Sequence, residues 1–261
     1  MVGNLLLRGM LVGVVAGLLC FGFLKIFGEP QVDRAIAFET QMDEAKDHAA
    51  HQAALAKGVA MPREEHEPEL VSRPVQSGIG LFTGVAVYSA AFGGLFALVF
   101  AFAHGRMGGL GPRATAALLA AGGLVAVYVV PTLKYPANPP SVGEPDTIGM
   151  RTALYFTMMA VSLAAMVVAA MLRNRLHRRF GAWNAALIAS AAYLVAVCVV
   201  GLLLPAVNEV PEQFPAVVLW QFRVASLGSQ VLMWATIGLL FGTLTERAAA
   251  SRSGWQLKAT A

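Results

Sequence analysis

Residues 205–230 read PAVNEVPEQFPAVVLWQFRVASLGSQ and pass from a proline-punctuated acidic loop directly into a hydrophobic helix. Proline interrupts regular hydrogen bonding in the first part, whereas the second part has the length and apolar content of a membrane helix. Arg223 lies roughly two turns inside that helix. A charged side chain at the bilayer centre costs about 2.5 kcal/mol or more, so we expect Arg223 to face protein, water or a ligand.

The rest of the chain has the composition of an integral membrane protein. Of its 261 residues, 57% are hydrophobic and 13% are charged, and the mean hydropathy is +0.64. Crossing a hydrocarbon core about 30 Å thick takes about 20 apolar residues. Six stretches qualify: residues 4–27, 79–104, 113–133, 152–172, 182–204 and 218–244. We therefore predict an all-α polytopic membrane protein with about six transmembrane helices, the first of them retained rather than cleaved as a signal peptide.

Basic residues predict the orientation of these helices. They concentrate in the connections after the second and fourth spans and in the tail, whereas acidic residues concentrate in the other three connections. The positive-inside rule then places both termini in the cytoplasm and predicts three helical hairpins, each joined on the outer side. The net charge of +4 is thus an orientation signal, and it does not indicate a nucleic-acid partner.

Glycines recur at four-residue spacing in three of the predicted spans. The first span carries Gly9, Gly13 and Gly17, and the second and sixth carry pairs at positions 80 and 84 and at positions 238 and 242. Small residues at this spacing allow a neighbouring backbone to come close, so we expect helix-packing faces here.

We predict a single membrane domain, residues 1–261, with an extracytoplasmic insertion at residues 28–77 that carries an amphipathic helix. The helix is expected to begin near Pro30 and end at Gly58, and the following residues 61–69 are expected to be extended. Glu44, His48 and His51 stand at i, i+4 and i+7 on this helix, a spacing that places metal-ligand types on one face. Nearby Asp47 and His66 could join them, and the alternative is an ordinary solvated surface.

The outer connections of the second and third hairpins resemble each other. Pro131 and Pro205 each end an outward-going helix, and Arg151 and Arg223 follow after 20 and 18 residues, near the start of the inward-going helix. In the connection between Pro131 and Arg151, residues 134–147 are rich in proline, which restricts the backbone to a few conformations. We expect these loops to form a preorganised mouth, as in carriers whose binding sites lie between repeats.

Catalytic and nucleotide-binding motifs are missing from the sequence. It contains no Gly-Lys-Ser/Thr phosphate loop, no His-Glu-x-x-His and no Gly-x-Ser-x-Gly, and its two cysteines are far apart. We expect no enzyme activity and no permanently bound cofactor. Polar residues instead gather at the outer side, where oxygen and imidazole ligands suit a divalent metal ion and arginines can hold carboxylates in place. The candidate ligands are Glu29, Asp33, Glu44, His48, His51, Asn208 and Glu209, with Arg34, Arg151 and Arg223 as electrostatic organisers.

Four blocks of this sequence resemble the CbtA family, the predicted cobalt transporter subunits of bacteria. They are residues 28–39 (GEPQVDRAIAFE), 134–140 (KYPANPP), 147–152 (TIGMRT), and 204–211 (LPAVNEVP) with the Phe-Arg pair at 222–223. The resemblance implies an inner-membrane permease component that supplies cobalt for cobalamin synthesis. It also implies a small partner of the CbtB type, with one membrane helix and a histidine-rich terminus. The family is usually described with five membrane helices, whereas the hydropathy of this chain predicts six.

Together these observations predict a membrane permease component for uptake of a divalent transition-metal ion, with Co²⁺ indicated only by the resemblance. Two alternatives stay open. One is a non-transporting scaffold or assembly subunit of a metal transporter. The other is an intramembrane enzyme acting on a lipid-linked substrate, with Asp33 or Glu209 as its general base.

Overall fold

Helices make up nearly all of the described chain. The structure, a computed structural model, describes residues 2–57, 71–140 and 142–259, with side chains described through Ser251. Within these residues the elements are α1 (Val2–Phe27), α2 (Glu29–Lys57), α3 (Arg73–Val75), the π-helix η1 (Gln76–Gly80), α4 (Leu81–Ala103), α5 (Pro112–Gly123), the π-helix η2 (Leu124–Val129), α6 (Val130–Lys134), the 3₁₀ turn η3 (Pro145–Thr147), α7 (Ile148–Leu203) and α8 (Ala216–Ala259). The predicted all-α class is confirmed.

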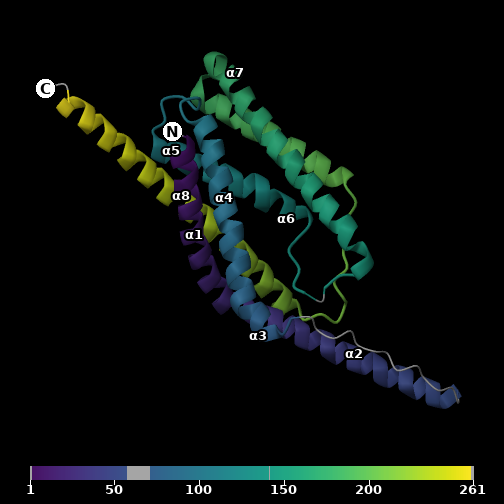
Figure 1. Ribbon diagram of the computed structural model, residues 1–261. Helices are drawn as coiled ribbons and strands as arrows, with labels where there is room; N and C mark the ends of the chain where they lie inside the picture. Colours follow the sequence, from purple (N-terminus) through teal and green to yellow (C-terminus); the bar gives the residue numbers. More distant parts are fainter. Residues whose placement is uncertain (1, 58–70, 141, 260–261) are drawn as a thin grey trace.

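Helix α7 supplies two of the predicted spans. Its 56 residues would extend about 84 Å if straight, more than twice the thickness of a hydrocarbon core. The helix turns back at Gly181, where φ is 75° and ψ is 172°, and its two arms run side by side (Figure 1). Among the described residues, five helical segments are long and apolar enough to cross a membrane, and because α7 folds in two they correspond to the six predicted spans.

We expect Gly181→Ala to destabilise the hairpin, because a Cβ strains the backbone at this positive φ even though no neighbouring atom lies within 4 Å of its position. Residues held in this region of φ/ψ space typically cost about 1–3 kcal/mol. The melting temperature of the purified protein should therefore fall. Gly149→Ala, in the same helix and equally open but with an ordinary backbone, is the matched control and should be neutral or slightly stabilising.

The connections sort to two ends of the molecule. Both termini and the turn of α7 lie at one end, while α2 and the loops that precede α7 and α8 lie at the other (Figure 1). The three connections that were predicted to lie on one side of the membrane are therefore at the same end of the molecule, as expected for three hairpins. The extended segment predicted for residues 61–69, which includes His66, lies outside the described residues.

A close-packed core joins α1, α4, α5 and α8. It is built around buried side chains that include Phe100, Trp234, Ile237 and Phe241. The glycine face of α1 lies directly against α4: a Cβ at Gly13 would overlap the carbonyl oxygen of Ser89. The predicted packing role of the α1 glycines is thus observed, and it sets the position of the first hairpin.

The α7 hairpin forms a second, smaller packing unit. Its arms meet around Met158, Tyr193 and Val197, and they pack against Val130 of α6. The hydroxyls of Ser162 and Tyr193 share a buried hydrogen bond of 2.8 Å between the arms. Beyond its own arms and the adjoining turn η3, α7 contacts the rest of the protein mainly through η2 and α6.

A third cluster ties α2 to the outer loops. Ala35 of α2 is fully buried against Val142, Phe214 and Val218. The rings of Phe38 and Phe214 meet edge to face with centroids 5.1 Å apart. The first three turns of α2 therefore help to hold the two proline-rich loops together, whereas the rest of the helix projects outward (Figure 1).

Candidate functional site

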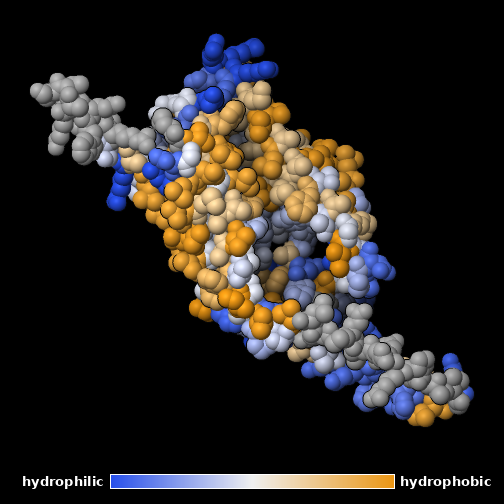
Figure 2. All heavy atoms as spheres, viewed as in Figure 1, coloured by the Kyte–Doolittle hydropathy of each residue, from blue (hydrophilic) through white to orange (hydrophobic). Residues whose placement is uncertain are grey.

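A cavity of about 810 Å³ lies at the end of the protein that the charge distribution predicts to face outward, between the proline-rich loop (residues 134–147), the start of α7, the 204–210 loop and α8. Figure 2 shows the molecule hollowed on the face between the α7 hairpin and the rest of the bundle, with hydrophilic atoms inside. The cavity is lined by Glu39, Tyr135, Pro136, Asn138, Pro139, Pro140, Val142, Gly143, Pro145, Ile148, Arg151, Thr152, Tyr155, Phe156, Val207, Asn208, Glu209, Val210 and Arg223. We call it the outer vestibule.

Glu209 fastens the two loops of the vestibule to each other. Its Oε2 atom accepts hydrogen bonds from the hydroxyl of Thr147 at 2.8 Å and from the backbone N–H of Glu144 at 2.9 Å. The same oxygen lies 3.3 Å from Nε of Arg151. These hydrogen bonds and the guanidinium lower the pKa of Glu209 below its ordinary value, so the carboxylate stays ionised well into the acid range.

The contacts of Glu209 leave its second oxygen to the vestibule. All three contacts above are made by Oε2, and none recorded among the described residues involves Oε1. Asn208, its exposed neighbour, also lines the vestibule. Two predicted ligands therefore stand together at one wall of the cavity, one as an anionic oxygen and one as an amide.

Arg223 connects α8 to the proline-rich loop. Its Nε donates to the carbonyl oxygen of Ala137 at 3.2 Å, and one terminal nitrogen donates to Oδ1 of Asn138 at 2.9 Å. Arg151 makes similar contacts on the other side of the loop, donating to the Thr147 hydroxyl and to the Glu144 carbonyl oxygen. The two arginines, predicted from their repeat position, thus hold opposite ends of one loop and line one vestibule.

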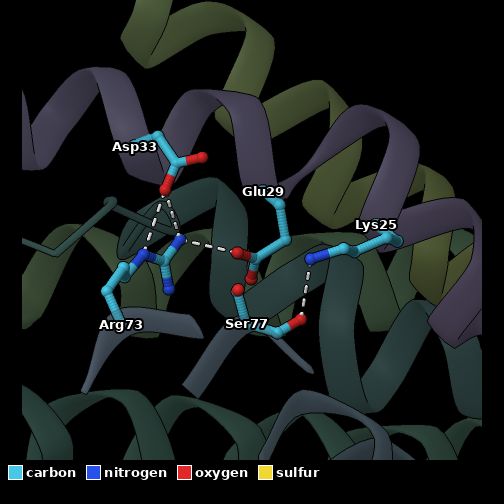
Figure 3. A network of polar contacts seen from close by, with 5 residues as sticks. All are labelled: Lys25, Glu29, Asp33, Arg73 and Ser77. Carbon is cyan, nitrogen blue, oxygen red and sulfur yellow. Dashed lines mark hydrogen bonds and ion pairs between the residues drawn. The ribbon is translucent and has the colours of Figure 1, made fainter. Parts of the chain in front are cut away.

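Glu29 and Asp33 lie elsewhere, in a network centred on Arg73 (Figure 3). Arg73 contacts the Glu29 carboxylate at 2.6 Å and Asp33 at 2.8 Å. Lys25 donates to the backbone carbonyl of Ser77 at 3.0 Å in the same region. Neither carboxylate lines the vestibule, so the structure separates these two predicted ligands from Asn208 and Glu209 and pairs them with an arginine that the sequence analysis did not single out.

We expect Arg73→Ala to loosen the junction of α1 and α2 with the segment that leads into α4. Hydrogen bonds to charged groups are worth about 1.5–3 kcal/mol, and the Glu29 carboxylate, 11% exposed, would be left without this partner. A lower melting temperature of the purified protein is the readout. Lys46→Ala is the control, because it removes an ion pair between two exposed side chains, Lys46 (72% exposed) and Asp43 (49% exposed). This substitution should change the melting temperature little.

The other predicted residues stand apart from the vestibule. Glu44, His48 and His51 are exposed on the projecting part of α2. Arg34 donates to the side chains of Gln31 and Gln221. Within residues 2–57, 71–140 and 142–259, no three His, Cys, Asp or Glu side chains gather closely enough to hold a metal ion.

Two vestibule residues were missed as site residues by sequence reasoning. Both are polar residues of the predicted outer connections, yet only the fold brings Glu39 from α2 to the cavity wall and Asn138 into hydrogen-bond contact with Arg223. The signal for Asn138 was its place in the proline-rich loop. The signal for Glu39 was its place in the block 28–39, which sets it apart from the acids that follow it on α2.

Comparison with known proteins adds one finding. The sequence model of a family described as "Probable cobalt transporter subunit (CbtA)" matches residues 2–246. No curated protein and no solved structure matches the chain. The matched region includes every residue that lines the vestibule and the six predicted spans.

Proposed function

Because this chain belongs to the CbtA family, described as "Probable cobalt transporter subunit", we propose that it is the permease component through which a divalent transition-metal ion, cobalt by family, enters the cell. The observation that carries this proposal is the outer vestibule. It is a cavity at the loop end of an all-helical membrane protein, and its lining combines apolar side chains with charged ones from α2, α7, α8 and the outer loops. Arg223 lies about two turns inside a membrane-length helix, where a charged group is costly and typically marks a substrate or ion pathway.

The proposed path begins at the vestibule. Asn208 and the Oε1 atom of Glu209 are the ligands we propose for the metal, while Arg151 and Arg223 keep the walls of the cavity in register. Glu29 and Asp33 belong to a different part of the outer surface, and their pairing with Arg73 suits a structural role at rest. The exposed face formed by Glu44, His48 and His51 is a proposed first collector of ions on α2.

Orientation and partners follow from the charge distribution and from the family. We propose that the vestibule faces outward across the bacterial inner membrane and that both termini are cytoplasmic, as the positive-inside rule predicts. The description of the family as a subunit supports a partner. We propose that this partner is the small single-span CbtB type and that the imported cobalt feeds cobalamin synthesis.

Radiolabelled cobalt uptake tests this function in cells that lack their own cobalt importers. The chain is expressed alone and with its small partner, beside a variant with a blocked vestibule. Thr152→Trp places a large ring at a lining position of α7 and should reduce uptake to background. Thr157→Trp makes the same change on the same helix, at an exposed residue outside the vestibule, and should leave uptake intact.

Other outcomes favour the other functions. Uptake that is absent for correctly inserted wild-type protein, with and without the partner, overturns the permease. If the partner's abundance then falls when the chain is deleted, the scaffold takes its place. Equal uptake by the Thr152→Trp and Thr157→Trp variants would mean that the transported ion does not pass through the vestibule.

A further inference from the structure

The charges that line the outer vestibule balance one another. Its carboxylates are Glu39 and Glu209, and its guanidiniums are those of Arg151 and Arg223. A site for a bare divalent cation needs a surplus of negative charge, because oxygen ligands must offset the charge that water stabilises in solution. The vestibule offers both signs in equal number.

Arg223 is the cation whose charge is least compensated. Its recorded hydrogen bonds are to neutral oxygens, the Ala137 carbonyl and the Asn138 amide. Arg151, by contrast, lies 3.3 Å from a carboxylate oxygen of Glu209. An arginine held inside a membrane helix against neutral partners and at a cavity wall is placed to bind an anion, since its guanidinium suits a carboxylate.

The size of the vestibule also exceeds that of a metal ion. Its volume of about 810 Å³ lies in the range of about 300–1,000 Å³ found for sites that bind drug-sized molecules. The described residues provide no cluster of three His, Cys, Asp or Glu side chains to replace the ion's own ligands. A cargo that keeps ligands of its own fits this cavity better than a stripped ion does.

We propose that the metal enters the vestibule as a complex with a small carboxylate chelator. The inference rests on the proposed function and names its substrate class. Arg223 binds a carboxylate of the chelator, and the metal faces Asn208 and the Oε1 atom of Glu209, which line the same cavity. A cavity lined by positive and negative charges therefore matches a ligand that contains both a metal cation and carboxylate anions.

A phospholipid headgroup could also satisfy an arginine at the outer end of a membrane protein. One observation favours the chelate. The vestibule wall includes the carboxylates Glu39 and Glu209, which repel a phosphate that carries no metal. In a chelate the metal ion offsets this repulsion, because its positive charge faces those carboxylates.

Equilibrium binding to the purified full-length protein in detergent tests the proposal. The probes are ⁵⁷Co²⁺ alone, ⁵⁷Co²⁺ with [¹⁴C]citrate, and [¹⁴C]citrate alone. We expect both labels to be retained together, and each to be retained far less by itself. Arg223→Gln should lower retention of both labels by about tenfold or more, as loss of one charge-assisted hydrogen bond implies. Arg223→Lys keeps the positive charge but loses the planar guanidinium that can bind a carboxylate through two hydrogen bonds. Its retention of both labels should lie between those of wild type and Arg223→Gln.

Asn138→Asp separates the chelate from a bare ion. It keeps Arg223 and its contact but supplies an internal carboxylate, so it should lower retention of the cobalt–citrate complex. If the vestibule bound a bare cation, the added negative charge would raise retention of ⁵⁷Co²⁺ instead. Elution volume and melting temperature, compared with wild type, show that each variant is folded.

Three results would overturn the chelate. They are ⁵⁷Co²⁺ retention that citrate does not change, citrate retention that does not need cobalt, and co-purified phospholipid that disappears in Arg223→Gln. The first of these leaves the permease standing, because uptake and its block by Thr152→Trp are measured separately. Absence of uptake, by contrast, removes the permease itself.

Discussion

Gly93→Ala is expected to prevent most of the protein from folding, although it adds a single methyl group. In the structure a Cβ at position 93 would overlap the carbonyl oxygen of Gly9 and would come within 2.9 Å of Cα of Gly13. Both neighbours are backbone atoms of α1, which cannot rotate away as a side chain can. Overpacking usually costs about 1–3 kcal/mol, and a clash between two helix backbones belongs at or above the upper end.

The neighbouring glycine of α4 provides the matched control. A Cβ at Gly94 would meet Cγ of Met10 at 3.2 Å and Cδ1 of Leu6 at 3.4 Å, which are flexible side-chain ends. Gly94→Ala should therefore be tolerated, helped by the higher helix propensity of alanine. Yield of monodisperse protein and melting temperature in detergent are the measurements. Equal behaviour of the two variants would mean that α1 and α4 do not pack as closely as described.

This pair of glycines also shows how far the sequence leads. The spacing of Gly9 and Gly13 predicts a close helix contact, and the contact is present. The partner was missed, because Ser89 and Gly93 also stand four residues apart but a search for glycine pairs alone finds Gly80 and Gly84 instead, and Gly84 has no atom within 4 Å of its would-be Cβ. A pattern of small residues shows that the backbone of another helix can come close to that face. Which helix packs there depends on the three-dimensional fold.

The positions of the apolar spans followed from hydropathy because the bilayer fixes the length of an apolar segment. The helix ends did not all follow, since α8 continues to Ala259, beyond the predicted end of its span at residue 244. No comparable physical constraint shows from the sequence which distant charged residues pair with each other. The acids Glu29 and Asp33 looked like free ligands in sequence, yet Arg73, some 40 residues further on, neutralises them. The vestibule was predictable as a proline-rich mouth, since proline restricts the loop locally, whereas the arrival of Glu39 from α2 depends on the whole fold.

Replacing Glu209 by glutamine is the substitution expected to affect transport most. Glutamine keeps one acceptor oxygen but loses the charge that Arg151 faces at 3.3 Å and the anionic oxygen proposed for the metal. The hydrogen bonds from Thr147 and Glu144 would weaken as well, because a neutral acceptor binds less strongly than a carboxylate. Cobalt uptake at matched expression should fall by about tenfold or more.

Glu212→Gln makes the same change three residues along the same loop. Glu212 is exposed and does not line the vestibule, so its uptake should equal that of wild type. Loss of uptake in both variants would indicate a general effect of loop charge. Full uptake in Glu209→Gln would show that neither the fastening of the loops nor the Oε1 atom is needed.

The pH dependence of stability provides a separate test of the same carboxylate. Because Thr147, Glu144 and Arg151 lower the native pKa of Glu209, the ionised form stabilises the folded state. This contribution is complete above the ordinary pKa of an unfolded glutamate, and it is lost as pH falls through the lower native pKa. The difference in melting temperature between wild type and Glu209→Gln should therefore be constant near neutral pH and shrink only in that acid window.

Thr147→Val shows which contact sets that window. The Thr147 hydroxyl is the largest cause of the lowered pKa, so its removal should move the loss of stability to higher pH, toward the ordinary glutamate value. At neutral pH the variant still carries an ionised Glu209 opposite Arg151 and should keep most of its uptake. A difference between wild type and Glu209→Gln that persisted unchanged throughout the acid range would mean that the charge of Glu209 does not hold the outer loops together.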